Sequence, residues 1–365
     1  MPKEKNKFFK PATFVPVVSL VLALLVGTVF ILLAGNNPIT VYGMMFQGAL
    51  GSQSGILQSL LQATPLIFCG LSVAIGQRGG LLNLGVEGQM YFGALFSALV
   101  GLYVKGIPHI LHVILCVVAG MIGGALWGLL PVILKLKRGV HEVVSSLMLN
   151  YIALLFVEFL TTNPLHSGES FTAQTKRLEE TATFTRLFPN SQVSTALFIA
   201  VAAVFFMYWF FKKTNTGYKI NMTGANLTAA KASGIPSGKM MVLTMLMSGA
   251  VAGLAGVGET LGTHGRLVYS FSSGYGFTGI AVAMLGSSFI TVIFSSLLFG
   301  CLRAGSVALS LGTNLSVRFI NMLQGIIILL IAAPVISMKI LQWRPLQKWR
   351  EKRVQKAQAG GAGHE

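Results

Sequence analysis

Residues 110–134 read ILHVILCVVAGMIGGALWGLLPVIL, and this run contains no Asp, Glu, Lys or Arg. It exceeds the roughly 20 apolar residues that an α-helix needs to cross a bilayer. Gly120, Gly124 and Gly128 recur within it every four residues, which favours close packing against another helix of the chain. The whole chain of 365 residues is similar in character, with 53% hydrophobic and 10% charged residues and a mean hydropathy of +0.72. Soluble domains carry about 25% charged residues, so the composition excludes a soluble or disordered protein and predicts an all-α protein that crosses a membrane several times.

Apolar runs along the chain predict about ten membrane segments. They lie at 14–34, 57–77, 81–104, 110–134, 143–162, 193–211, 240–262, 276–301 and 319–338. The run 276–301 is interrupted near residue 286 and is followed by another apolar piece at 302–313. We therefore expect a short half-helix to about 286, a return through 289–312 and then the last span. Some segments are thus predicted to be broken or re-entrant.

Basic residues predict the orientation, because positive charge is retained on the cytoplasmic side of a membrane protein. They gather at 1–13, 135–138, 212–239 and 339–356. The stretch 163–192 balances three basic residues against three Glu, so we expect it outside the cytoplasm. Both termini should then be cytoplasmic. The predicted layout is a basic N-terminus (1–13), a transmembrane domain (14–338) and a basic tail (339–365).

Motifs for catalysis, metal binding and nucleotide binding are missing from the sequence. His141-Glu142 is not followed by a second His at the zinc-protease spacing, since Ser145 stands there. The stretch from Gly234 to Lys239 is similar to a phosphate-binding loop, but it is one residue too short between its glycines and lacks a Ser or Thr after the Lys. We expect no catalytic residue, no metal site and no ATP site in this chain.

The stretch 78–90, RGGLLNLGVEGQM, brings polar groups into an apolar region. Asn83 and Glu87 are four residues apart, which predicts that they share one face of a helix. A charged side chain at membrane depth costs roughly 2.5–3.5 kcal/mol on insertion scales, so Glu87 needs a partner or water. It either borders a hydrated pathway or makes a structural hydrogen bond, to Arg78 or Asn150 for example. The residues leave both interpretations open.

Two other apolar runs carry polar residues. Glu142 begins the run 143–162, where a negative charge in the first turn is favoured by the helix dipole. Asn150 lies deeper and suits either an interhelical hydrogen bond or a pathway position. The run 240–262 ends with Glu259, His264 and Arg266, which either receive a docking partner, line an outer mouth or are solvated at the interface.

The stretch 212–239 reads KKTNTGYKINMTGANLTAAKASGIPSGK and contains no acidic residue. Thr223 or Asn226 is predicted to cap a short helix over 227–233 that Gly234 closes. A short helix held between two spans can pass force to them. The alternative is a plain surface loop that satisfies the positive-inside rule.

Four stretches in this order resemble one family. They are RGGLLNLGVEGQ (78–89), GVHEVVSSLMLNYIA (139–153), GYKINMTGANLTAAKASGI (217–235) and GYGFTGIAVAMLG (274–286). They are similar to the permease subunits of bacterial ABC importers of the branched-chain amino acid and ribose type, and most of all to the nucleoside and simple-sugar permeases. One departure is Ser287-Ser288-Phe289, where the family commonly has a polar turn similar to Arg-Asn-Asn-Pro.

The resemblance implies a transport subunit rather than an enzyme. It implies alternating-access import of nucleosides, with simple sugars such as ribose or galactose as the alternative, across a bacterial cytoplasmic (inner) membrane. A separate ABC ATPase subunit would hydrolyse ATP, so this chain would bind no cofactor. A second permease chain, identical or homologous, would complete the pathway, and an extracytoplasmic binding lipoprotein would deliver substrate. Membrane lipid is a further expected partner and nucleic acid is not.

The resemblance also implies residue roles by position. The polar stretch of the substrate pathway maps onto Asn83, Glu87 and Gln89, to which we add Asn150 and Glu259 as pathway candidates. The coupling helix that docks on the ATPase maps onto Gly217, Gly224, Asn226, Ala229, Ala230, Gly234 and Ile235. A rival hypothesis is a secondary transporter in which Glu87 or Glu259 carries protons and no ATPase is needed.

Overall fold

The computed structural model describes residues 11–33, 35–168, 172–189, 191–286 and 288–312, together with residues 322, 325 and 326. The chain divides into two units, Met1–Val41 with Ser316–Glu365, and Tyr42–Leu315. In the first unit the apolar run predicted at 14–34 forms helix α1 (Pro11–Leu33). The basic N-terminus before residue 11 and the basic tail lie outside the described residues, as does the predicted final span at 319–338 apart from those three positions.

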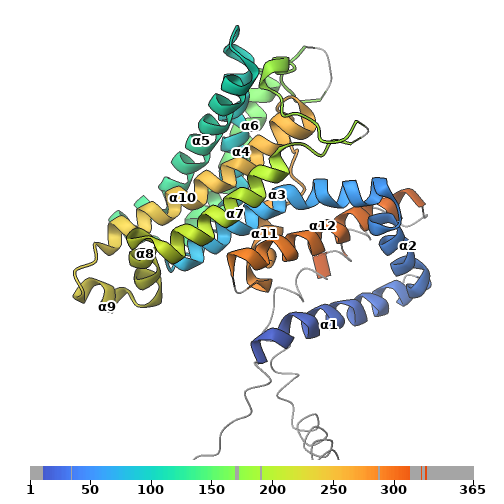
Figure 1. The fold of residues 1–365 in the computed structure, drawn as a ribbon, viewed down its shortest axis with the longest axis horizontal. Coiled ribbons are helices and arrows are strands. Elements are labelled where there is room, and N and C mark those ends of the chain that lie inside the picture. Colours follow the sequence, from blue (N-terminus) through green and yellow to red (C-terminus); the bar gives the residue numbers. More distant parts are fainter. Residues whose placement is uncertain are drawn as a thin grey trace, which may run out of the picture. The chain divides into compact units, whose positions relative to one another are not determined.

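The second unit is built from helices, which follow α2 (Pro38–Leu50) along the chain (Figure 1). They are α3 (Gln53–Arg78), α4 (Val86–Tyr103), α5 (His109–Arg138), α6 (Glu142–Thr162), α7 (Ala196–Lys213), α8 (Asn215–Ala225), α9 (Leu227–Ala232), α10 (Ser237–Val257), α11 (Tyr275–Leu285) and α12 (Phe289–Gly312). A π-helix, η2 (Gly258–His264), continues α10, and a short 3-10 helix, η1 (Glu180–Ala182), lies between α6 and α7. Within the described residues no strand forms beyond two isolated bridges. The prediction of an all-α protein is confirmed.

Six of the described helices are long and apolar enough to cross a membrane. They are α3, α5, α6, α7, α10 with its π-helical extension, and α12. The interrupted run 276–301 does form a short helix, α11, and a return helix, α12, as expected. The total of about ten segments and the side on which the termini lie stay predictions.

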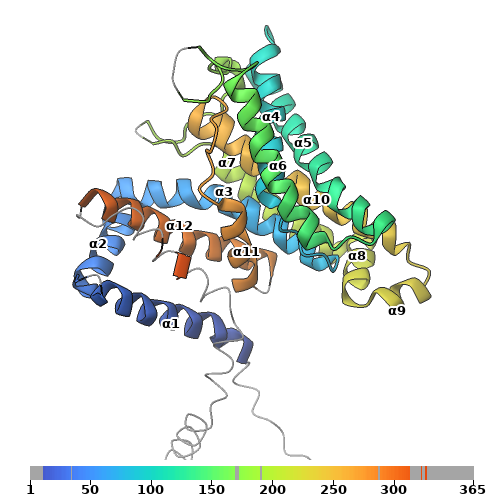
Figure 2. The same ribbon diagram turned by 180° about the vertical axis from the view of Figure 1, so that it is seen from behind.

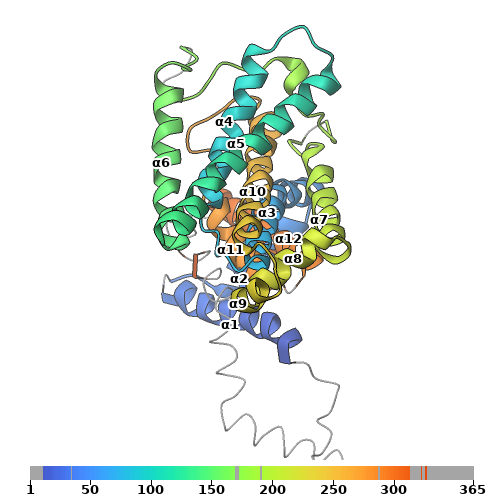
Figure 3. The ribbon, with the colours of Figure 1, turned by 90° about the vertical axis from the view of Figure 1, so that its left-hand side faces the viewer.

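Helix α10 packs against α3, α4 and α5, and it lies among them in Figure 3. The α5–α10 contact is made through glycines, as the four-residue spacing predicted. A Cβ atom on Gly124 would collide with the carbonyl oxygen of Gly249, and one on Gly253 would collide with that of Gly120. Small residues let the two backbones approach this closely.

The two ends of this helical unit differ in charge. One end, which we call the basic end, carries the last turns of α5 and α7 with Lys135, Lys137, Arg138, Lys212 and Lys213, together with α8 and α9. The opposite end, which we call the far end, carries the α4–α5 and α6–α7 connections and η2 (Figure 2). All the charge clusters predicted to be cytoplasmic that the structure describes in this unit therefore lie at the same end.

Candidate functional site

The chain breaks between α3 and α4, and Asn83 occupies this break. The prediction that Asn83 shares a helix face with Glu87 is wrong, because the backbone turns at Gly80 (φ +71°) and α4 begins only at Val86. Asn83 is fully buried, and its Nδ2 donates to Gln89 Oε1 (2.8 Å) and to Ser248 Oγ (2.8 Å). Its Oδ1 accepts from the backbone N–H of Gly85 (3.0 Å) and from Gln89 Nε2 (3.1 Å).

Asn150 on α6 holds the first turn of α4. Its Oδ1 accepts from the backbone N–H of Gly88 (2.9 Å), and its Nδ2 donates to the carbonyl oxygen of Leu84 (2.8 Å). Leu84 precedes α4 and Gly88 lies in its first turn, where backbone groups have no hydrogen-bond partner within the helix. The sequence left two interpretations of Asn150 open, an interhelical hydrogen bond or a pathway position. The structure contains the interhelical hydrogen bonds.

Glu87 meets the start of the half-helix α11. The backbone N–H of Gly276 donates to Glu87 Oε2 at 2.6 Å, and the carboxylate is buried. Gly274 enters the helix in the left-handed conformation (φ +82°). A negative group is favoured at a helix N-terminus, because the unpaired N–H groups point at it. Glu87 thus makes a structural hydrogen bond, although to Gly276 rather than to the expected Arg78 or Asn150.

Arg303 on α12 is a buried cation beside the same helix start, and sequence analysis missed it. Its Nη1 donates to Ser273 Oγ (2.7 Å), and its Nη2 donates to the Ser273 carbonyl oxygen and to Thr278 Oγ1 (both 3.0 Å). Its guanidinium carbon lies 4.4 Å from the ring centroid of Tyr275, close enough for a cation–π interaction. The available signal was a lone Arg inside the apolar run 289–312.

Glu259 lies on a different element, the π-helix that continues α10. It is eleven residues beyond Ser248, which is about 16 Å along a helix at ~1.5 Å per residue. The carboxylate is buried, and its Oε2 lies 3.6 Å from His264 Nε2. It borders a small cavity that also touches Leu61 and Pro65 of α3. The five pathway candidates are therefore split between the α4 break and the far end.

Two larger cavities open at the far end. One of about 820 Å³ is lined by Gln53, Gln58 and Leu61 of α3 and by Arg186 and Gln192 of the α6–α7 connection. Another of about 540 Å³ shares Arg186 and Gln192 and extends to the end of η2. Backbone hydrogen bonds attach this connection to η2 and the residues after it, for example Phe184 N–H to Leu261 O and Leu178 N–H to Gly265 O, both at 3.0 Å.

At the basic end, the predicted short helix is confirmed as α9. Asn226 is its N-cap and accepts from the backbone N–H of Ala229 at 3.0 Å, whereas Thr223 lies inside α8. Gly234 follows in the left-handed conformation (φ +74°). Ala229 is exposed but Ala230 is fully buried, so only one of the two alanines is free to meet a partner.

The three other predicted coupling residues lie in the fold as follows. Gly217 and Gly224 are on α8, where a Cβ atom would press against backbone of a neighbouring segment. Ile235 is half-buried, and its N–H donates to the carbonyl oxygen of Ala230 at 3.0 Å. The sequence did not predict α8, because its residues are mostly polar and small and lack a clear apolar face.

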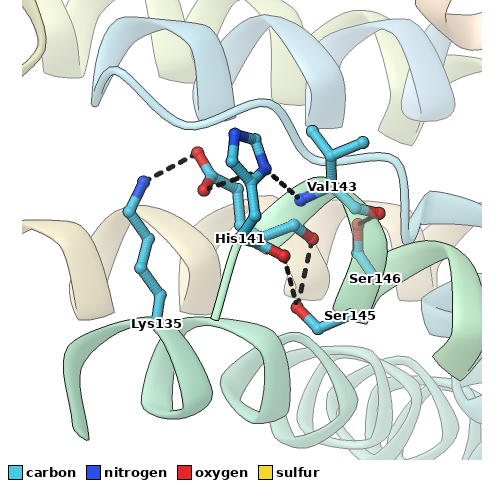
Figure 4. A network of polar contacts seen from close by, with 6 residues as sticks. Lys135, His141, Val143, Ser145 and Ser146 are labelled. Atoms are coloured by element: carbon cyan, nitrogen blue, oxygen red, sulfur yellow. Dashed lines mark hydrogen bonds and ion pairs between the residues drawn. The ribbon is translucent and has the colours of Figure 1, made fainter. Parts of the chain in front are cut away.

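The short α5–α6 connection at the basic end is fixed by an ion pair (Figure 4). Lys135 Nζ lies 2.7 Å from Glu142 Oε1. His141 is the N-cap of α6, and its Nδ1 accepts from the backbone N–H of Val143 at 3.4 Å. Glu142 occupies the first turn as expected, and it also binds the end of the preceding helix.

Residues 55–332 match the family described as the branched-chain amino acid transport system / permease component. The chain belongs to this family. The permease is 36% identical to the nucleoside ABC transporter permease protein NupB of Lactococcus lactis, with 80% of this chain and 83% of that protein covered. It is 32% identical to the guanosine ABC transporter permease protein NupP of Bacillus subtilis (87% and 92%) and 32% identical to the glucose ABC transporter permease protein TsgB13 of Haloferax volcanii (86% and 85%). No solved structure matches the chain.

Proposed function

We propose that the permease is the membrane-spanning subunit of an ATP-driven importer that moves nucleosides into the cell by alternating access. A separate ATPase subunit supplies the energy, a second permease chain completes the pathway, and an extracytoplasmic binding protein delivers the substrate. The supporting observation is the similarity to NupB and NupP, which are named for nucleosides and cover 80–87% of this chain. The similarity to a glucose permease keeps a simple sugar as the second candidate.

The basic end supports the coupling role. Helix α9 is a capped, mostly exposed element that lies with α8 between the apolar helices α7 and α10, and the stretch 212–239 holds no acidic residue. In this proposal the basic end faces the cytoplasm, and the exposed face around Ala229 meets the ATPase.

The far end supports a substrate entrance. The two cavities of about 820 and 540 Å³ share Arg186 and Gln192. Leu61 lines both the larger of them and the small cavity at Glu259, and Thr263 lines both the smaller of them and that cavity, so the three spaces adjoin one another. In this proposal Glu259 is the first pathway carboxylate that an incoming substrate approaches, and it accepts hydrogen bonds from substrate hydroxyl groups.

The polar atoms of Asn83, Gln89 and Asn150 are engaged by the chain itself. In this proposal they form the wall of the pathway and do not bind the substrate tightly. Weak binding inside the membrane suits an importer, because the binding protein already supplies the affinity.

The first test is uptake of labelled uridine and adenosine in cells with and without this chain, with excess unlabelled ribose as competitor. Loss of nucleoside uptake on deletion, unaffected by ribose, is the expected result. Unchanged nucleoside uptake in cells without a second nucleoside system would transfer the assignment to sugars. Uptake that collapses with an uncoupler while cellular ATP is maintained would favour the proton-coupled alternative.

A further inference from the structure

A turn of the membrane region packs directly on the predicted coupling segment. Gly224 near the end of α8 lies against the backbone of residues 78–80, which end α3. A Cβ atom on Gly224 would collide with the carbonyl oxygen of Arg78 and lie 2.6 Å from the nitrogen of Gly80. In the other direction, a Cβ atom on Gly80 would lie 2.9 Å from the Cα of Gly224. Glycine is thus required on both sides of this contact.

On the coupling side, α8 is joined to α9 at Asn226, and nearly all of α9 is exposed. A force applied to α9 therefore acts on the end of α8 that carries Gly224. Thr223, the neighbouring residue, is buried, so this end of α8 is packed rather than loose.

On the membrane side, the turn continues into the break before α4. Leu81 packs in a buried cluster with Val132, Met241 and Met245. Two residues later, Asn83 binds Gln89 and Ser248. The break then leads directly to Glu87 in the first turn of α4, whose carboxylate accepts from the first turn of α11. The contact therefore lies at the beginning of a continuous chain of buried contacts.

This contact differs from the other routes out of the coupling segment. Helices α7 and α10 are covalently continuous with residues 212–239, so their movement needs no special contact. Helices α3 and α4 are remote in sequence and can be moved from this segment only through packing. A backbone-to-backbone contact has no side chain whose rotamer can absorb a displacement, and close-packed groups transmit strain.

We propose that Gly80 and Gly224 are positioning residues for transport, through which movement of the coupling segment reaches the break before α4 and hence Asn83 and Glu87. The proposal rests on the proposed function, since it requires an ATPase that moves α9. Neither glycine touches the substrate in this account.

The test compares Gly224→Ala with Gly238→Ala, in cells that depend on this chain for uptake. Gly238 lies in the first turn of α10 at the same end, and the nearest atom to a Cβ there is Leu136 Cδ2 at 3.9 Å, so alanine fits. A tag on the permease allows the complex to be purified, its ATPase subunit quantified and its ATP hydrolysis measured. We expect Gly224→Ala to lower uptake about tenfold or more, since small misplacements far from a site can cost that much. The amount of complex and its ATP hydrolysis should stay near wild type, and Gly238→Ala should transport normally.

Three results would overturn the proposal. They are wild-type uptake by Gly224→Ala, a fall in uptake that only follows the amount of permease in the membrane, and loss of the ATPase from the purified complex. The second would assign Gly224 a folding role and the third a role in the docking surface. Failure of the proposed function is seen separately, because the wild-type chain would then restore neither nucleoside nor sugar uptake.

A second variant tests the contact itself. Gly80→Ala disturbs the same contact from the other side, with Gly139→Ala as its control, because Gly139 has a similar φ (+69°) but no atom within 4 Å of a Cβ. If both glycines act at one contact, the double variant Gly80→Ala/Gly224→Ala should lose little more uptake than either single variant, since neighbouring sites are not additive. Losses that multiply, or a Gly139→Ala loss as large as that of Gly80→Ala, would contradict a shared contact.

Discussion

Replacing Asn83 with alanine should destabilise the permease, because this side chain holds the break before α4 together. The change removes four hydrogen bonds, to Gly85, to Ser248 and two to Gln89. It leaves the buried N–H of Gly85 and the amide of Gln89 without these partners. Ser248 keeps its bond to the carbonyl oxygen of Ser72 (2.7 Å), so the loss is confined to the break.

The magnitude follows from the four bonds. Hydrogen bonds between side chains in membrane proteins contribute on average about 0.6 kcal/mol each, and those in soluble proteins about 1 kcal/mol. Asn83→Ala should therefore cost about 2.5–4 kcal/mol of stability. The matched control is Asn163→Ala, since Asn163 is exposed at the end of α6 and its side chain makes a single bond, to the carbonyl oxygen of Phe159. It should cost less than about 1 kcal/mol.

The assay is thermal inactivation of the tagged permease in detergent, read as the fraction that remains monodisperse after heating, together with uptake per molecule in cells. Asn83→Ala should lower the midpoint temperature well below those of wild type and Asn163→Ala. The molecules that remain folded should still transport. An unchanged midpoint combined with lost uptake would refute the reasoning, because Asn83 would then act on the substrate and not on the fold.

Three further variants test other contacts. Glu142→Gln weakens the pair with Lys135 (2.7 Å) and should lower the same thermal midpoint by the equivalent of about 1 kcal/mol or less, with the difference shrinking in high salt. Glu87→Gln keeps an acceptor for the Gly276 N–H but loses the negative charge at the start of α11, which is worth about 0.3–1 kcal/mol. Uptake of labelled substrate should therefore fall but persist. Complete loss of uptake with normal folding would instead favour a proton-carrying Glu87. Ala229→Trp, on the exposed face of α9, should abolish uptake and reduce the ATPase that co-purifies while leaving the permease in the membrane; normal uptake would remove the coupling assignment.

Much of the helical layout could be predicted from apolar runs and glycine spacing. Residues 276–301 were correctly divided because Gly286 interrupts the run, and Asn226 was among the two predicted caps because Asn at this position accepts from the first turn. The gap between the runs 57–77 and 81–104 predicted that one helix ends near residue 78, but not that the next begins only at Val86. Glycines that allow close helix packing look the same in a sequence as glycines such as Gly80, which adopts a positive φ and turns the chain.

The pairing of polar residues could not be predicted for a related reason. Spacing along a helix identifies neighbours on that helix but not the atoms that a neighbouring helix presents. Glu87 binds the N–H of Gly276, which is 189 residues away, and Arg303 binds groups on the turn before α11. The charge of Arg303 was visible, but its partner is created by a helix that begins inside the protein.

These partners suggest why polar residues are present at this depth. Asn150 binds backbone at the start of α4, Glu87 binds backbone at the start of α11, and Arg303 binds the Ser273 carbonyl just before it. Irregular backbone at membrane depth is tolerated only where its free N–H and C=O groups find partners. The polar side chains therefore stabilise the two helix starts. A substitution that removes such a side chain should lower the stability, while the molecules that remain folded still transport. Transport rate per folded molecule is therefore the measurement that distinguishes a pathway residue from one that supports a break.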